Sequence, residues 1–117
     1  MLLMESIAEE LSSFSTKFKI CTHTPDPTAN SQIVIIRGGG RYVKGLNGSV
    51  VYTVVQIQVY HKDKRTAEIT MNKVIEKLDS NTNISGVEIA HWAGAVHYWT
   101  ADNGLHCFVT EFVLIHV

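Results

Sequence analysis

The residues of this chain that could do chemistry gather toward its C-terminal end, where three of its six histidines stand near a cysteine. His91, His97, His106 and Cys107 lie on segments with strand-like patterning, and Asp102 is the only acidic residue among them. Their separations match neither HExxH nor any other compact ligand pair, so the pattern favours half-exposed strand histidines over a metal site. A nucleophile could only be Cys107 with His91 or His106. A thiol in an alternating strand is normally a small core residue, and no nucleophile elbow is visible, so we expect no catalytic residues and no enzymatic activity.

A second candidate is the glycine run Gly38-Gly39-Gly40, which Arg37 and Arg41 flank and which could cradle a phosphate through backbone N–H groups. The run lacks the Gly-Lys-Ser/Thr ending of a P-loop and opens no helix. From Arg37 to Gly48 the chain carries five glycines, two arginines and a lysine, with Asn47-Gly48 as a turn signal. The segment therefore predicts either a flexible excursion or a hairpin tip. A mobile loop that orders against a neighbour is favoured over a phosphate site, and no cofactor is expected.

Composition places the chain among single globular domains. It has 117 residues, 45% hydrophobic and 18% charged, with a net charge of −1. This balance gives no long-range attraction for nucleic acid or anionic lipid. No run approaches the roughly 20 apolar residues of a membrane span. The two cysteines, Cys21 and Cys107, have no disulfide or zinc-finger spacing, so we expect a reduced, intracellular setting and no membrane partner.

The elements that must position these residues begin with an amphipathic helix, in which Leu3, Ile7, Leu11 and Phe14 recur at helical spacing. Short strands are expected at 18–22 and at 33–36, the second buried on both faces and ending abruptly at Arg37.

From Val50 to Leu78 the apolar period changes from two to 3.6, which indicates a strand that feeds a helix over about 64–79. Beyond this helix, strand segments are expected at 87–91 and 95–100, on either side of a bulge at Gly94. Asn103-Gly104 is typical of a type I′ hairpin turn before the last strand, His106–Val117. That strand is apolar on both sides, so one face needs a partner or a second layer.

The fold class predicted is α+β: a mainly antiparallel or mixed β-sheet packed against two α-helices, in the order α-β-β-β-α-β-β-β, as a single domain over residues 1–117. Three aromatic residues, Trp92, Tyr98 and Trp99, cluster near the C-terminal hairpins. Such side chains anchor protein interfaces as well as cores, and the adjoining glycine bulge and short hairpin favour contact.

In order and spacing, these features resemble a family of small tailed-phage structural proteins, the minor capsid proteins that look like tail terminators, also called tail completion or head–tail joining proteins. The resemblance runs nearly the whole length and rests on the acidic first helix, Ile33–Ile36 with its Gly-rich loop, and the strand-to-helix unit. The unit reads Val54-Val55-Gln56-Ile57-Gln58-Val59-Tyr60, then Ala67-Glu68-Ile69-Thr70-Met71-Asn72-Lys73-Val74. The closing segments are Trp99-Thr100-Ala101-Asp102-Asn103-Gly104 and Phe108-Val109-Thr110-Glu111-Phe112. The chain departs from the family pattern at Gly94, where a proline is expected.

The resemblance implies a virion protein that forms a homo-oligomeric ring, a hexamer, which terminates the tail tube at the head-proximal end of a phage tail. Its partners would be sister copies, the tail tube protein and the head connector protein, with DNA only as passing genome. It would act in the tail or neck of the virion, after assembly in the host cytoplasm. Expected subunit or lumen contacts are Arg37, Arg41, Tyr42 and Lys44, and expected partner contacts are Trp92, Trp99, Asp102, Asn103 and Gly104.

Two rival functions stay open from the sequence. One is a head-closure or adaptor protein of the same neck. The other is a small-ligand-binding or catalytic α+β domain that uses His91, His97, His106 and Cys107.

Overall fold

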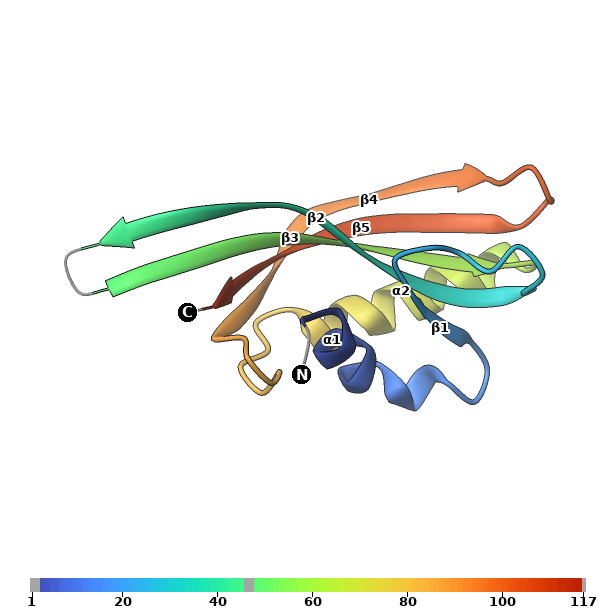
Figure 1. Ribbon diagram of the computed structural model, residues 1–117. Helices are drawn as coiled ribbons and strands as arrows, with labels where there is room; N and C mark the ends of the chain where they lie inside the picture. The colour runs from blue at the N-terminus through green and yellow to red at the C-terminus, as the bar shows by residue number, and fades with distance from the viewer. Residues whose placement is uncertain (1–2, 46–47, 117) are drawn as a thin grey trace.

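The computed structural model describes residues 3–45 and 48–116, with the backbone alone for residues 39–45 and 48–50. Five strands and two α-helices form it (Figure 1). In chain order the elements are α1 (Leu3–Glu10), the 3-10 turn η1 (Ser12–Phe14), β1 (Lys19–Thr22), β2 (Ser31–Gly45), β3 (Gly48–His61), α2 (Lys64–Leu78), β4 (Ile89–Thr100) and β5 (His106–His116).

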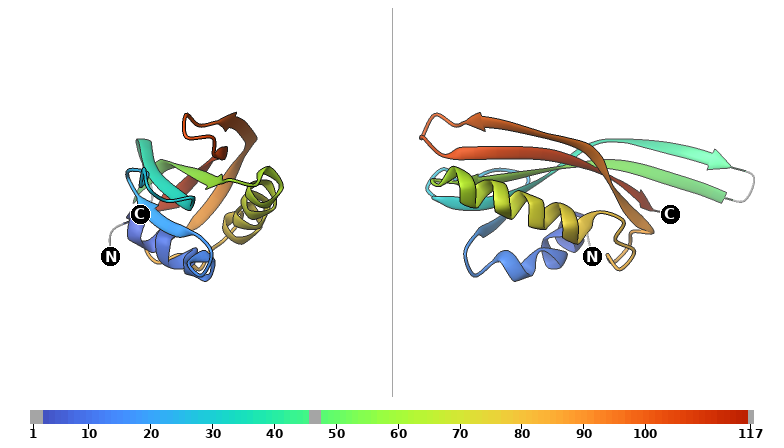
Figure 2. Two further views of the ribbon diagram at one scale, coloured as in Figure 1. Left: turned by 90° about the vertical axis from the view of Figure 1, so that its right-hand side faces the viewer. Right: turned by 180° about the vertical axis from the view of Figure 1, so that it is seen from behind.

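The strands make one sheet in the order β1-β2-β3-β5-β4. β1 runs parallel to β2, and the other three pairs are antiparallel, so the sheet is mixed. Both helices pack on the same face of this sheet (Figure 2). The α+β class predicted from the sequence is therefore confirmed. None of the helices in the described ranges is long and apolar enough to cross a membrane.

The sequence-based prediction that the second strand ends at Arg37 is wrong. β2 continues to Gly45 and pairs with β3 as far as Gly45 opposite Gly48. The glycines do not end the strand because a bulge absorbs them: the register shifts between Arg37 and Gly40 and then resumes. Of the two alternatives for the Gly-rich segment, a hairpin is what the described residues form. Asn47, part of the expected turn, lies outside them.

The expected pair of strands around Gly94 is a single strand, so the order has one strand fewer than predicted. β4 crosses this point with a register shift between Trp92 and Val96. Gly94 adopts φ +88°, a left-handed conformation that side chains rarely take. The bulge was thus predicted correctly, but it bends the strand without dividing it.

The core lies between the helices and the sheet. Alternate β3 residues Val55, Ile57 and Val59 are each at most 1% exposed and face the helices, since side chains alternate between faces along a strand. Ile7 of α1 and Val74 of α2 belong to the same buried cluster as these β3 residues. The two expected helices, with their buried apolar faces, are confirmed.

The opposite face of the sheet has no helix over it. Near β1 the protein's own loops cover it, and a small buried cluster forms there from Cys21, Val34, Tyr60, Leu105 and Cys107. Gln32 fixes one of these loops: its side-chain oxygen accepts from Asp26 N at 2.8 Å and its amide donates to Asp26 O at 2.9 Å. The expected second covering layer is therefore supplied in part by loops. Val113 and Ile115, further along β5, stay half-exposed.

Replacing Ile57, which is fully buried, with alanine should lower the free energy of unfolding by about 2–5 kcal/mol, because a cavity would remain under both helices. Chemical denaturation followed by circular dichroism would measure the change. Ile69→Ala is the matched control, since Ile69 is 44% exposed on α2 and should change stability by less than about 0.5 kcal/mol. Equal effects of the two substitutions would contradict the assignment of the core.

Candidate functional site

The residues expected to make contacts lie toward opposite ends of an elongated molecule, whose extents are 50 × 24 × 23 Å, with one exception. Trp92, an expected partner contact, lies across the sheet from Arg37, in the same row of paired residues. At one end the hairpin of β2 and β3 forms an arm, defined here as residues 37–45 and 48–54, whose tip projects beyond the other strands (Figure 1). Within the arm, β5 borders β3 only from Val51 to Val54. At the other end lie the C-terminal end of β4, the turn of residues 101–105 and the start of α2. The resulting arrangement presents two different surfaces, one at each end.

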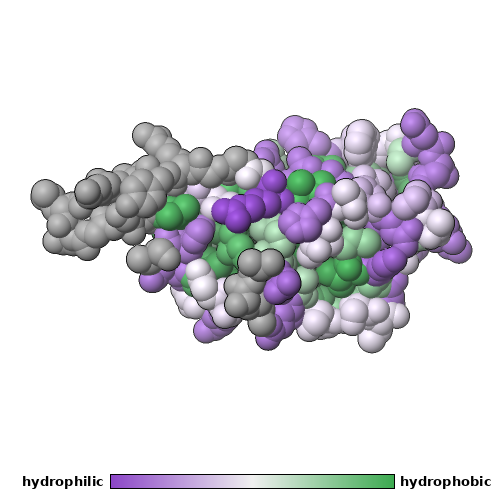
Figure 3. Space-filling view, viewed as in Figure 1, coloured by the Kyte–Doolittle hydropathy of each residue, from purple (hydrophilic) through white to green (hydrophobic). Residues whose placement is uncertain are grey.

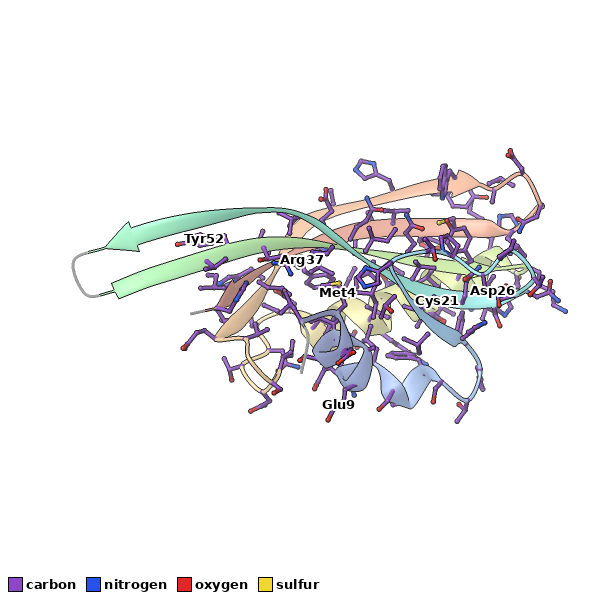
Figure 4. All side chains as sticks on the ribbon, viewed as in Figure 1. Met4, Glu9, Cys21, Asp26, Arg37 and Tyr52 are labelled. Atoms are coloured by element: carbon purple, nitrogen blue, oxygen red, sulfur yellow. The ribbon has the colours of Figure 1, made fainter. Side chains whose placement is uncertain are left out.

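The arm carries all four residues expected as subunit or lumen contacts. Arg37 is exposed where the arm leaves the body, and Figure 4 shows it there, with Tyr52 further out. Arg41, Tyr42 and Lys44 follow on β2, paired through their backbones with β3. Their side chains lie outside the described part of the structure. The backbone brings all four residues onto one strand of the arm.

Gly38 has a steric reason to be glycine. An added Cβ would stand 3.1 Å from the backbone oxygen of Val54, closer than nearly all such contacts. At the root of the arm a larger residue would therefore require the two strands to move apart by a few tenths of an ångström. This glycine supports the close pairing of the hairpin strands.

The two tryptophans expected as partner contacts differ in environment. Trp92 packs against the helix-side core, and its indole N–H donates to the Thr110 hydroxyl at 2.8 Å. Its backbone N–H donates to Asp79 Oδ1 at 3.1 Å, so the residue helps to hold the loop after α2. Trp99 lies on the opposite face with 52% of its surface exposed. Only Trp99 of this pair offers a large accessible surface to a partner.

Asp102, Asn103 and Gly104 form the exposed turn between β4 and β5, as expected, but not with the predicted turn type. A type I′ turn needs positive φ at both central residues, whereas here only Gly104 has it, at +82°. Leu105 O accepts from Ala101 N at 2.8 Å, which closes a three-residue loop with its glycine in the left-handed region. The extra loop residue explains the difference.

A shallow depression of about 330 Å³ lies on the helix-free face beside Trp99. Gln56, Gln58, His97, Tyr98, Trp99 and Val109 line it. Tyr60 Oη donates to Gln58 Oε1 at 2.8 Å, and Gln58 Nε2 donates to Gln56 Oε1 at 2.7 Å, so the two amides are held in place along β3. The alternation of glutamines with buried residues in the sequence was the signal for this face, and it was missed.

The four residues of the catalytic alternative do not converge. His97 lines the depression, and His91 lies further back along β4, opposite Val113. Neighbouring residues in a strand point to opposite faces, so Cys107 faces the loop-covered side while His106 contacts Tyr98 on the helix side. Burial raises the pKa of the Cys107 thiol, which makes it a poor nucleophile. Among residues 3–38, 51–116 no group of three or more His, Cys, Asp or Glu could hold a metal ion.

A cluster at the start of α2 joins this helix to the end of β4. Lys64 Nζ lies 4.4 Å from the centre of the Tyr98 ring, and Tyr98 Oη shares a hydrogen bond with His106 Nδ1. Asp63 caps the helix, since its carboxylate accepts from Thr66 N at 3.2 Å and from the Thr66 hydroxyl. These contacts fix the outer half of β4 against the helix, although Tyr98 remains 41% exposed.

The described residues thus form an elongated α+β domain with two unlike ends. Neither a protein-family model nor a curated protein sequence matches the chain. Among solved structures, a chain in the virion of a native gene transfer agent particle has the same fold, with a TM-score of 0.73. The two are 12% identical, and the alignment covers 97% of this chain and 93% of that one. The likeness therefore extends over the whole domain and concerns the fold.

Asp63→Ala should lower the unfolding temperature at neutral pH, because the first turn of α2 would lose its cap. The hydrogen bonds from Thr66 lower the pKa of the Asp63 carboxyl, so its contribution is present above the unfolded-state pKa of about 4 and is lost as the pH falls through the lowered folded pKa. Thermal unfolding followed between neutral and acidic pH would measure both effects. Asp63→Asn is the matched control and should keep the cap while weakening the dependence on pH. An alanine variant as stable as the parent would contradict the assignment.

Proposed function

We propose that this protein is a structural component of a phage-like virion, which forms a ring at the head-proximal end of the tail, terminates the tail tube and joins it to the head connector. The observation that carries the proposal is the shared fold, over nearly the full length of both chains, with a component of a gene transfer agent virion. The family resemblance of the sequence points to the same class independently of that comparison.

The two unlike ends of the molecule support a ring. A head-to-tail ring uses two different surfaces of each subunit, whereas a two-fold dimer uses one surface twice. The arm at one end and the β4 end at the other meet this requirement. A hexamer is the proposed closed form, from the family resemblance.

Tail tube and connector are the proposed partners, one on each flat side of the ring. The helix-free face, with exposed Trp99 beside ordered Gln56 and Gln58, has the mixture of apolar and hydrogen-bonding groups that protein interfaces use. In the space-filling view, hydrophobic residues reach the surface among hydrophilic ones on the body (Figure 3). DNA would pass through the ring without being held, in keeping with a net charge of −1.

We also propose that the protein is not an enzyme. The separation of His91, His97, His106 and Cys107 supports this over the ligand-binding or catalytic alternative. A head-closure or adaptor protein of the same neck is the second candidate within the structural class, because the fold alone is compatible with either position.

Negative-stain electron microscopy of the purified protein, alone and with tail tubes, should show annuli and tubes capped at one end. Ring formation should be unaffected by chelators or by thiol-blocking reagents, which separates this function from the catalytic rival. The same preparation should bind duplex DNA more weakly than micromolar at physiological salt. Protein that never associates, with or without tubes, would overturn the ring, and tubes left uncapped by intact rings would favour the adaptor position.

A further inference from the structure

The arm leaves a long row of backbone groups without a partner strand. β1 pairs with β2 only up to Ile35, whose carbonyl oxygen accepts from His23 N at 2.8 Å. Beyond this point no described strand borders the outer edge of β2. Backbone groups of antiparallel strands alternate between their two neighbours, so the register places the N–H and C=O groups of Gly40, Tyr42 and Lys44 on this free edge. Beyond the pair of Tyr42 and Val51 no third strand of the described chain borders the hairpin. An isolated two-stranded ribbon is marginally stable in water, so an added strand would stabilise this tip.

β4 provides a second free edge at the opposite side of the sheet. Its first residues are covered, because Ala90 exchanges hydrogen bonds with the loop after α2, accepting from Ser80 N at 2.8 Å and donating to Asn81 O at 3.1 Å. The N–H and C=O groups of Ala90 therefore point away from β5, toward the outer edge of β4. After the bulge, the pairing of β4 with β5 places the N–H and C=O groups of Val96, Tyr98 and Thr100 on the same outer edge, and no described strand pairs with them.

The free stretch of β4 lacks the usual protection of an edge strand. Natural edges carry charges or prolines that prevent pairing with another chain. From Ala93 to Thr100 there is no lysine, arginine, aspartate, glutamate or proline. Instead Val96, Tyr98 and Trp99 are exposed by 39%, 41% and 52%. An unprotected, apolar edge of this kind is a template for an added strand.

The directions and positions of the two edges match. The arm and the free stretch of β4 lie at opposite ends of the long axis (Figure 1), so copies placed end to end bring one to the other. β2 and β4 run in opposite directions in the sheet order β1-β2-β3-β5-β4. Copies in the same orientation would therefore pair these strands antiparallel, which is the more stable ladder.

We propose that the arm of one copy adds its β2 edge, residues 40–44, as an antiparallel strand to residues 96–100 of β4 in the next copy. The contact deepens the proposed ring and rests on it, since it names the surface through which sister copies join. It is heterologous, and each subunit uses its arm once and its β4 edge once.

Two variants each remove one side of this contact, the arm in one variant and the β4 edge in the other. An arm-deleted variant lacking residues 41–52 can close its hairpin through Gly39 and Gly40, and it removes no described core residue. Val96→Pro removes an outward N–H that the fold itself does not use, at a position where an edge strand tolerates proline. Val96→Ala is the matched control, because it shortens the same side chain and keeps the N–H.

In size-exclusion chromatography with light scattering, the parent chain and Val96→Ala should form the closed oligomer, while the arm-deleted variant and Val96→Pro should each be monomeric. An equimolar mixture of these two variants should give a heterodimer and nothing larger, since it contains one intact arm and one intact edge. If both variants assemble like the parent, strand addition is overturned while the ring stands. A monomeric parent overturns the ring and the contact together.

Hydrogen exchange measured on the parent chain keeps the test independent of how the variants fold. In the oligomer the amide protons of Tyr42, Val96 and Tyr98 should exchange at least about tenfold more slowly than in dilute monomer. The amides of His97 and Trp99, which already pair with β5, should be protected in both states. Equal exchange at Tyr42 and Tyr98 in the two states would contradict strand addition.

Discussion

The backbone ladder between β2 and β3 is the interaction on which the rest of this structure depends. These strands have 15 and 14 residues, whereas β1 has only 4 and β5 has 11, so the central hairpin is longer than the neighbours that border it. One half of the hairpin forms the middle of the sheet and carries the core residues Ile35 and Ile57. In the other half, the outer edge of β2 has no neighbouring strand in the described chain, and β5 borders β3 only as far as Val51. The same two strands thus supply both the stability of the domain and its least satisfied surface.

Two glycines at bulges allow the long strands to keep their pairing. Gly38 permits the close approach of the strands at the root of the arm, and Gly94 lets β4 turn past Trp92 while keeping its pairing with β5. The first bulge adds one residue to β2 and so reverses which of its backbone groups face outward, those of Ile35 before it and those of Gly40 after it. The second bulge adds two residues to β4, so the groups of Ala90 before it and of Val96 after it both face outward. The bulge in β2 therefore decides which N–H and C=O groups of the arm are left for a partner.

The sequence predicted the helices, the core strands and the bulge at Gly94 because these depend on periodicity and local backbone geometry. It did not predict that β2 continues beyond Arg37, since a glycine run has no side-chain pattern and its pairing with β3 is a tertiary effect. The turn at Asn103-Gly104 was placed correctly but given the wrong type, because one more loop residue changes the geometry. For the site, exposure at Trp99 and its absence at Trp92 could not be distinguished, as both follow the same strand pattern and only the core contacts of Trp92 separate them.

Assembly through strand addition depends on the backbone, and the side chains at both ends of the molecule determine which strands can meet. Native mass spectrometry of the purified chain over a range of concentrations tests this claim most directly. A single closed species, six copies on the present proposal, with little of any intermediate size, is the predicted result. An unlimited ladder of sizes would contradict closure of the ring, and a symmetric dimer at every concentration would contradict head-to-tail contact altogether.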